Sequence, residues 1–143
     1  MRLRMFWLAC LTVLTGAANS AAAQDFRDNC GADSGNICFN GGDLYINAGT
    51  ALATAAARLN MQSDGNLALY DETGRGRWAT GTYDHPGAYA VFQRDGSFGV
   101  YWNGRVLFAT ATSGRGAYLA LRRDGNLVIY DYENTPIWAV FPP

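Results

Sequence analysis

The chain has 143 residues, of which 16% are charged, and its formal net charge is −1. Nucleic-acid binding rests on clusters of cations that neutralise phosphates, so this composition argues against a nucleic-acid partner. Glycine and aromatic residues are abundant. With turn signals recurring between short apolar stretches, this mixture predicts an all-β fold rather than a helical one.

Residues 1–23 are predicted to be a secretory signal peptide. Two arginines precede the apolar run MFWLACLTVLTGA, which is shorter than a bilayer span, and small residues at Ala-x-Ala spacing follow it. Cleavage is expected after Ala23, with Ser20 as the rival position, and an uncleaved membrane anchor is the alternative. The mature chain is then mildly acidic, has no membrane span, and is secreted or periplasmic.

Two cysteines lie in the N-terminal segment, residues 24–42. Cys30 and Cys38 bound the short loop CGADSGNIC, and an even, closely spaced pair in an exported chain is expected to form a disulfide. A metal site is the weaker alternative, because no histidine or second cysteine pair stands nearby. We therefore expect no metal and no cofactor.

Three copies of one unit fill residues 43–143, which are expected to form one domain. In each copy an alternating strand runs into an Asp-Gly step, a strong hairpin signal. These steps recur about every 30 residues, a period typical of repeat folds. They lie at Asp64, Asp95 and Asp124. The strands that follow the steps end in Tyr70, Tyr101 and Tyr130.

The last strand of each unit carries a large aromatic side chain. These residues are Trp78, Phe108 and Trp138. Three small sheets can bury their inner faces only by packing around a shared axis, so the three aromatics are predicted to form the central core rather than a ligand platform. Residues 50–61, TALATAAARLNM, favour a helix by alanine content, but they stand where the first repeat needs a hairpin and are predicted to be strands.

Three segments similar to Q-x-D-x-N-x-V-x-Y are the most specific feature of the sequence. With them, the chain resembles the bulb-type mannose-binding lectin family over about residues 43–141. The resemblance implies the β-prism II fold, with three four-stranded antiparallel sheets around a pseudo-threefold axis and one shallow sugar site on each sheet. In that family the motif Asp and Asn hold the 2-hydroxyl of mannose, Gln the 3-hydroxyl and Tyr the 4-hydroxyl, while Val contacts the ring carbons.

Carried over to this chain, the resemblance implies three carbohydrate-binding sites. The first comprises Gln62, Asp64, Asn66, Ala68 and Tyr70, with Ala68 in the place of valine. The second comprises Gln93, Asp95 and Tyr101, with Ser97 and Gly99 replacing asparagine and valine. The third comprises Asp124, Asn126, Val128 and Tyr130, with Arg122 replacing glutamine.

The residue types themselves rank the three sites. Asn66, Ala68 and Tyr70 alternate along one strand and share a face, where polar groups that donate and accept can match vicinal sugar hydroxyls. The first site keeps every polar group, and the second is expected to be weak. In the third, Arg122 cannot accept a hydrogen bond. It could close the site on Asp124 or retune it towards an anionic or substituted glycan.

The expected partners are mannose-containing glycans or polysaccharide. An enzyme is not expected, because the single histidine, His85, has no Ser or Cys partner nearby, and three Asp-Gly turns around an axis cannot oppose two carboxylates across a cleft. A protein-interaction or structural module with decayed sugar sites is the main alternative, and an antibacterial lectin-like protein is another. Homodimer formation through the tail PIWAVFPP is left open.

Overall fold

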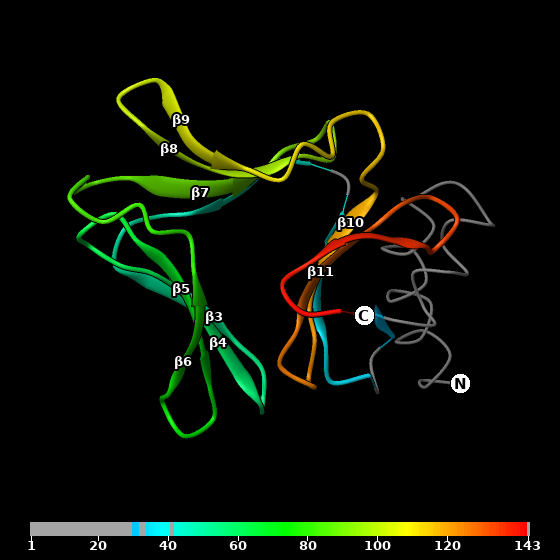
Figure 1. Ribbon diagram of the computed structural model, residues 1–143. Helices are drawn as coiled ribbons and strands as arrows, with labels where there is room; N and C mark the ends of the chain where they lie inside the picture. Colours follow the sequence, from blue (N-terminus) through cyan, green and yellow to red (C-terminus); the bar gives the residue numbers. More distant parts are fainter. Residues whose placement is uncertain (1–29, 32–33, 41, 143) are drawn as a thin grey trace, which may run out of the picture.

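The computed structural model describes residues 30–31, 34–40 and 42–142 of the chain (Figure 1). The predicted signal peptide and its cleavage positions lie outside these residues. The described chain is folded into antiparallel strands, as predicted, and Figure 1 shows three sheets facing a common centre. In this part of the molecule no helix is long and apolar enough to cross a membrane.

Each sheet has four strands and belongs to one repeat. The first-repeat sheet has the order β3 (Thr50–Ala53), β4 (Ala57–Met61), β5 (Leu67–Asp71) and β6 (Gly76–Ala79). The second-repeat sheet has the order β2 (Leu44–Ile46), β7 (Tyr89–Phe92), β8 (Phe98–Trp102) and β9 (Arg105–Ala109). The third-repeat sheet has the order β1 (Ile37–Asn40), β10 (Tyr118–Leu121), β11 (Leu127–Tyr130) and β12 (Pro136–Ala139).

The strands that precede the first motif are shared out among the three sheets. β1, β2 and β3 are consecutive in the chain, yet each forms the edge of a different sheet. β1 lies before residue 43, so the predicted N-terminal segment contributes a strand to the prism by pairing with β10. This arrangement ties the two ends of the described chain together.

The alanine-rich stretch at residues 50–61 forms the β3–β4 hairpin, as predicted. Along β4 the burial alternates, with Ala57, Leu59 and Met61 inside and Arg58 and Asn60 on the outer face. Burying alternate side chains on a sheet outweighs the small intrinsic preference of alanine for a helix.

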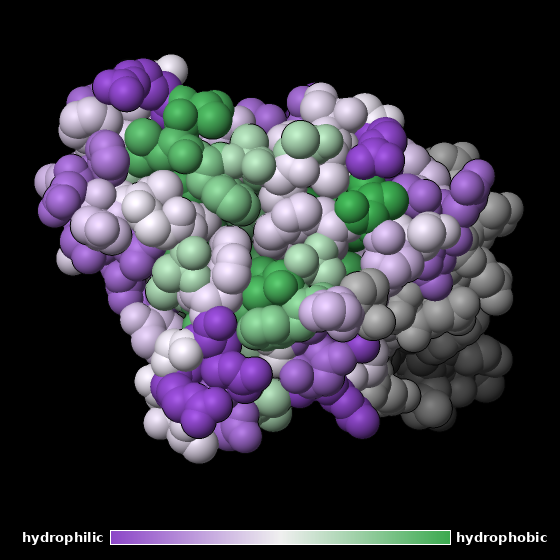
Figure 2. Space-filling view, in the orientation of Figure 1, coloured by the Kyte–Doolittle hydropathy of each residue, from purple (hydrophilic) through white to green (hydrophobic). Residues whose placement is uncertain are grey.

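The deepest part of the core is mostly aliphatic. The following side chains are fully buried: Leu59, Met61, Leu67, Leu69, Phe98, Val100, Leu127 and Ile129. Trp78, Phe108 and Trp138 form a triangle of edge-on rings with centroids 5.7, 6.0 and 6.3 Å apart. They are only partly buried, because they come from the edge strands β6, β9 and β12. Figure 2 shows apolar surface gathered between the three sheets.

Candidate binding sites on the three sheets

The Asp-Gly step of each repeat forms the same turn. The Oδ1 atoms of Asp64, Asp95 and Asp124 each accept a hydrogen bond, 2.9–3.0 Å long, from the backbone N–H two residues later. The glycine of each step has a φ near +90°, which side chains other than glycine rarely adopt. The turn therefore uses one carboxylate oxygen and leaves Oδ2 to face other groups.

The turn of the first repeat rests on the loop that joins the first two sheets. A Cβ at Gly65 would lie 2.3 Å from the carbonyl oxygen of His85, so only glycine fits there. The backbone N–H of His85 donates to the carbonyl of Asp64 at 3.0 Å, and its ring packs edge-on against Trp102 at 5.0 Å. His85 therefore supports the turn through its backbone.

Each motif tyrosine follows an irregularity in the ladder. The register shifts between Leu69 and Tyr70, and the same shift occurs before Tyr101 and Tyr130. A β-bulge changes the direction in which a side chain leaves the sheet. The three bulges place the tyrosine hydroxyls near the residue at the start of each motif, as the hydrogen bonds of the first and third repeats show.

In the first-repeat site the polar side chains keep groups that no protein atom uses. Asn66 Oδ1 accepts from the backbone N–H groups of Gly81 at 3.0 Å and Thr82 at 3.2 Å. These bonds fix the amide, and its Nδ2 has no partner within the described chain. Asp64 Oδ2 likewise has none there, so an acceptor and a donor stand free beside each other.

Gln62 and Tyr70 complete this site. Gln62 Nε2 donates to the hydroxyl of Tyr70 at 2.6 Å, which leaves Gln62 Oε1 to accept and the Tyr70 proton to be donated. Ala68 lies between Asn66 and Tyr70 on the outer face, opposite Asn60, and forms an apolar floor. The structure thus brings together all five residues predicted for the first site.

The second-repeat site keeps fewer free polar groups than the first-repeat site. Asp95 Oδ2 accepts from the hydroxyl of Ser113 at 2.8 Å, so both carboxylate oxygens are in use. Ser97 is buried. A Cβ at Gly99 would lie 2.6 Å from the carbonyl oxygen of Phe108, so the position cannot hold the valine of the motif without a shift in the backbone.

Tyr101 in the second-repeat site belongs to a row of tyrosines. It stacks on Tyr89 at 6.0 Å, and Tyr89 contacts Tyr45 at 5.9 Å. Burial raises the pKa of the Tyr101 hydroxyl, and the Asp95 carboxylate adds to this effect. The hydroxyl therefore stays protonated at neutral pH.

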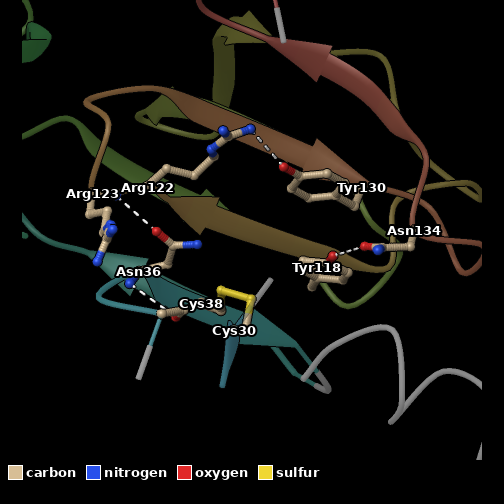
Figure 3. The surroundings of a disulfide bond; sticks show 9 residues. Cys30, Asn36, Cys38, Tyr118, Arg122, Arg123, Tyr130 and Asn134 are labelled. Atoms are coloured by element: carbon tan, nitrogen blue, oxygen red, sulfur yellow. Dashed lines mark hydrogen bonds between the residues drawn. A yellow bond between two sulfur atoms is a disulfide. The ribbon is translucent and has the colours of Figure 1, made fainter. Parts of the chain in front are cut away.

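The third-repeat site is closed by its own residues. Arg122 Nη2 lies 2.5 Å from Asp124 Oδ2. Arg122 Nη1 donates to the Tyr130 hydroxyl at 3.0 Å (Figure 3). Of the two outcomes that the sequence left open for Arg122, the structure contains the contact with Asp124. Asn126 Nδ2 donates to the Phe141 carbonyl, and the Phe141 N–H donates to Asn126 Oδ1, both at 3.0 Å.

The outer face of the third-repeat sheet is also covered. The predicted disulfide between Cys30 and Cys38 is present, with a Cα–Cα distance of 5.8 Å. It packs against a cluster that contains Val128, which is fully buried, and Tyr130, which is 4% exposed. In the third-repeat site, therefore, Asp124 and Asn126 are already paired with protein groups and the valine is buried.

Comparison with known proteins decides the family. No family model and no curated protein matches the chain, but solved structures do. A monomeric mannose-binding lectin from Gastrodia elata is 37% identical, with a TM-score of 0.64, and the match covers 74% of this chain and 96% of that one. The chain belongs to the bulb-type mannose-binding lectin family.

Two further structures agree with this assignment. A lectin from Allium sativum is 35% identical to this lectin chain, with a TM-score of 0.58 over 73% of this chain and 97% of that one. The mannose-specific agglutinin of Galanthus nivalis, solved with methyl-α-D-mannoside, is 31% identical, with a TM-score of 0.56 over 72% and 98%. The β-prism II fold is confirmed, and because these relatives are lectins the prediction of a non-enzyme is confirmed too.

Two features of the lectin's sites were not predicted from the sequence. The Ser113 hydroxyl donates a hydrogen bond to the Asp95 carboxylate, and the Phe141 carbonyl accepts one from the Asn126 amide. Both come from outside the motif and carry no pattern that points to it. As for metals, no three His, Cys, Asp or Glu side chains gather into a cation site in residues 30–31, 34–40 and 42–142.

Proposed function

We propose that this lectin chain is exported and binds mannose-containing glycans or polysaccharide through its first-repeat site. One observation carries the proposal: within the described part of the chain, the first site alone keeps free hydrogen-bonding groups on all four of its polar side chains. The Galanthus nivalis relative was solved with methyl-α-D-mannoside, which supports mannose as the sugar.

The free groups have the chemistry that a pyranose needs. Asp64 Oδ2 and Gln62 Oε1 accept, whereas Asn66 Nδ2 and the Tyr70 hydroxyl donate. Each sugar hydroxyl both donates and accepts, so neighbouring hydroxyls can use such alternating groups. Asp64 supplies the one carboxylate of the set, and a carboxylate acceptor makes the strongest hydrogen bonds of the four. A site of this kind distinguishes an axial from an equatorial hydroxyl by direction.

Binding at one such site is expected to be weak. A few hydrogen bonds of about 0.5–1.5 kcal/mol each, on an exposed face, give an affinity near the millimolar range. Strong attachment to a polysaccharide then requires several copies of the chain on one surface. Once one copy is bound, the others meet the polysaccharide at a high effective concentration, so the copies together bind more tightly than one site.

The test is titration of the mature chain with methyl α-mannoside, followed by calorimetry or NMR shifts. Asp64→Asn keeps the turn but replaces the charged acceptor, and is expected to cost about 1.5–3 kcal/mol, a tenfold loss or more. Asp95→Asn and Asp124→Asn are the matched controls, and should change binding little because their Oδ2 atoms already have protein partners. Equal losses in all three variants would contradict the assignment of the site.

A protein-interaction module on the lectin fold is the second candidate function. The observation that favours it is the closure of two of the three sites by protein groups. It predicts that the wild-type chain shows no shift with mannose even far above millimolar concentrations. That result would overturn the proposal of sugar binding.

A further inference from the structure

A hollow of about 480 Å³ adjoins the first-repeat site on the outer face of its sheet. Tyr70 lines both the site and the hollow, whose other walls include Ala53, Ala55, Arg58, Asn60 and Glu72. This volume lies within the range of pockets that hold small molecules. The hollow begins where the primary site ends, at the Tyr70 side chain.

The hollow exists because the first-repeat sheet lacks a tyrosine that the other two sheets have. Tyr101 is opposite Tyr89, and Tyr130 is opposite Tyr118, with stacked rings in both pairs. The partner of Tyr70 in the same register is Arg58. On the next strand, Ala53 lies opposite Arg58, so a methyl group stands where a larger side chain could fill the space.

The turn after the motif strand also carries a smaller residue in the first-repeat sheet than in the third-repeat sheet. In the third-repeat sheet the Tyr118 hydroxyl bonds to the side chain of Asn134. Asn134 and Gly74 hold equivalent places, since each donates its backbone N–H to the aspartate three residues earlier. A Cβ at Gly74 would meet nothing within 4 Å. The Tyr118–Asn134 pair thus fills a space that Arg58 and Gly74 leave open.

The groups in the hollow suit a neutral, hydroxylated ligand. The side chains of Arg58, Asn60 and Glu72 make no hydrogen bond or ion pair with any described residue, so they supply free donors and acceptors. The Asp71 carboxylate is already used by Thr73 and by the backbone of Arg75. The free charges are then one cation and one anion, which favours neither an anionic nor a cationic ligand.

We propose that the hollow is a second sugar subsite, which holds the neutral hexose next to the residue bound at Asp64 and Asn66. The inference rests on the proposed function of the primary site. Tyr70 joins the two subsites: its hydroxyl accepts from Gln62, so its proton is directed outwards. A glycosidic oxygen accepts a hydrogen bond but cannot donate one, so a donor directed outwards at this point suits the linkage between two hexoses.

The test compares methyl α-mannoside with the four α-linked mannobioses by calorimetry. For the wild type, at least one mannobiose should bind about fivefold more tightly, the gain of one or two net hydrogen bonds. The double variant Arg58→Tyr/Gly74→Asn copies the pair that fills the third-repeat sheet. It should lose this preference and keep the affinity for methyl α-mannoside, and asparagine tolerates the positive φ of Gly74.

Controls separate this inference from the proposed function. Arg58→Ala removes the donors without filling the hollow and should also lose the preference, which covers the case in which the double variant does not fold. Arg105→Ala, an exposed arginine on the second-repeat sheet, should change nothing. Equal binding of all sugars by the wild type, or a preference that survives both Arg58 variants, would overturn the subsite but not the primary site. If no sugar binds, both proposals fall.

Discussion

The first-repeat and third-repeat sites carry nearly the same motif, but polar groups that are free in the first are hydrogen-bonded to other protein groups in the third. Asn66 and Asn126 both accept backbone N–H groups through Oδ1. Asn126 also donates through Nδ2 to Phe141, whereas the Nδ2 of Asn66 is free within the described chain. The comparison teaches that the same motif can present free donors and acceptors in one repeat and paired ones in another, depending on the residues around it.

The largest effect is expected on stability, from the core tryptophan that both repeats share. Trp78 and Trp138 meet in one aromatic triangle, so alanine at either position should destabilise the fold by a similar amount. Because both rings are partly exposed, we expect about 3 kcal/mol, the lower end of the range for such changes. Thermal or denaturant unfolding measures the loss, with the exposed Tyr132→Ala as control. A variant that loses mannose binding but keeps its stability would show that these aromatics belong to a binding site and not to the core.

The disulfide distinguishes the two repeats, since it covers only the third-repeat sheet. Replacing Cys30 and Cys38 with serine should lower the free energy of unfolding by about 2–3 kcal/mol, an upper estimate for so short a loop. Mannose binding at the first-repeat site should not change, because that site is on another sheet. Unfolding and titration of the same variant check both statements. A parallel loss of mannose binding would show that the disulfide also supports the first-repeat site.

A smaller effect is expected when the third-repeat motif is restored. Arg122→Gln removes an ion pair that is partly exposed, which should cost no more than about 1 kcal/mol of stability. The number of mannose sites should stay the same, because Phe141 still occupies Asn126 and the disulfide still covers Tyr130. A second binding event in calorimetry would show that Arg122 alone closes the site.

The smallest effect concerns the turn of the first-repeat sheet beside the hollow. The hydroxyl of Thr73 and the backbone N–H of Arg75 bond to Asp71 and hold its pKa below the usual 3.8. A lowered pKa in the folded state means that the carboxylate stabilises the fold above pH 3.8, and that this contribution is lost as the pH falls through the folded-state pKa. An NMR titration of Asp71 should show its midpoint below 3.8, and a midpoint at or above that value would contradict the bonding described.

The sequence was enough to predict most of the fold. The triplicated motif indicated three sheets, and the hairpin at residues 50–61 followed from its place in the first repeat. The ion pair between Arg122 and Asp124 was one of two outcomes that the sequence left open, because a long guanidinium can reach the motif carboxylate. In contrast, the contacts of Ser113 and Phe141 join segments 15–18 residues apart, and no local pattern encodes them. The exposure of the aromatic triangle depends on edge strands that become visible only in three dimensions.

The distribution of β1, β2 and β3 among the three sheets sets the order in which the fold can be completed during synthesis. All strands of the first-repeat sheet have been made once β6 is complete, whereas the second-repeat sheet needs β9 and the third needs β12. Pairings between residues far apart in sequence are slow to form, and Ile37 must find Leu121. As the polypeptide is made from its N-terminus, the strands needed for the first, second and third sheets become complete in that order, and β1, the first strand of the described chain, has to wait longest for its partner.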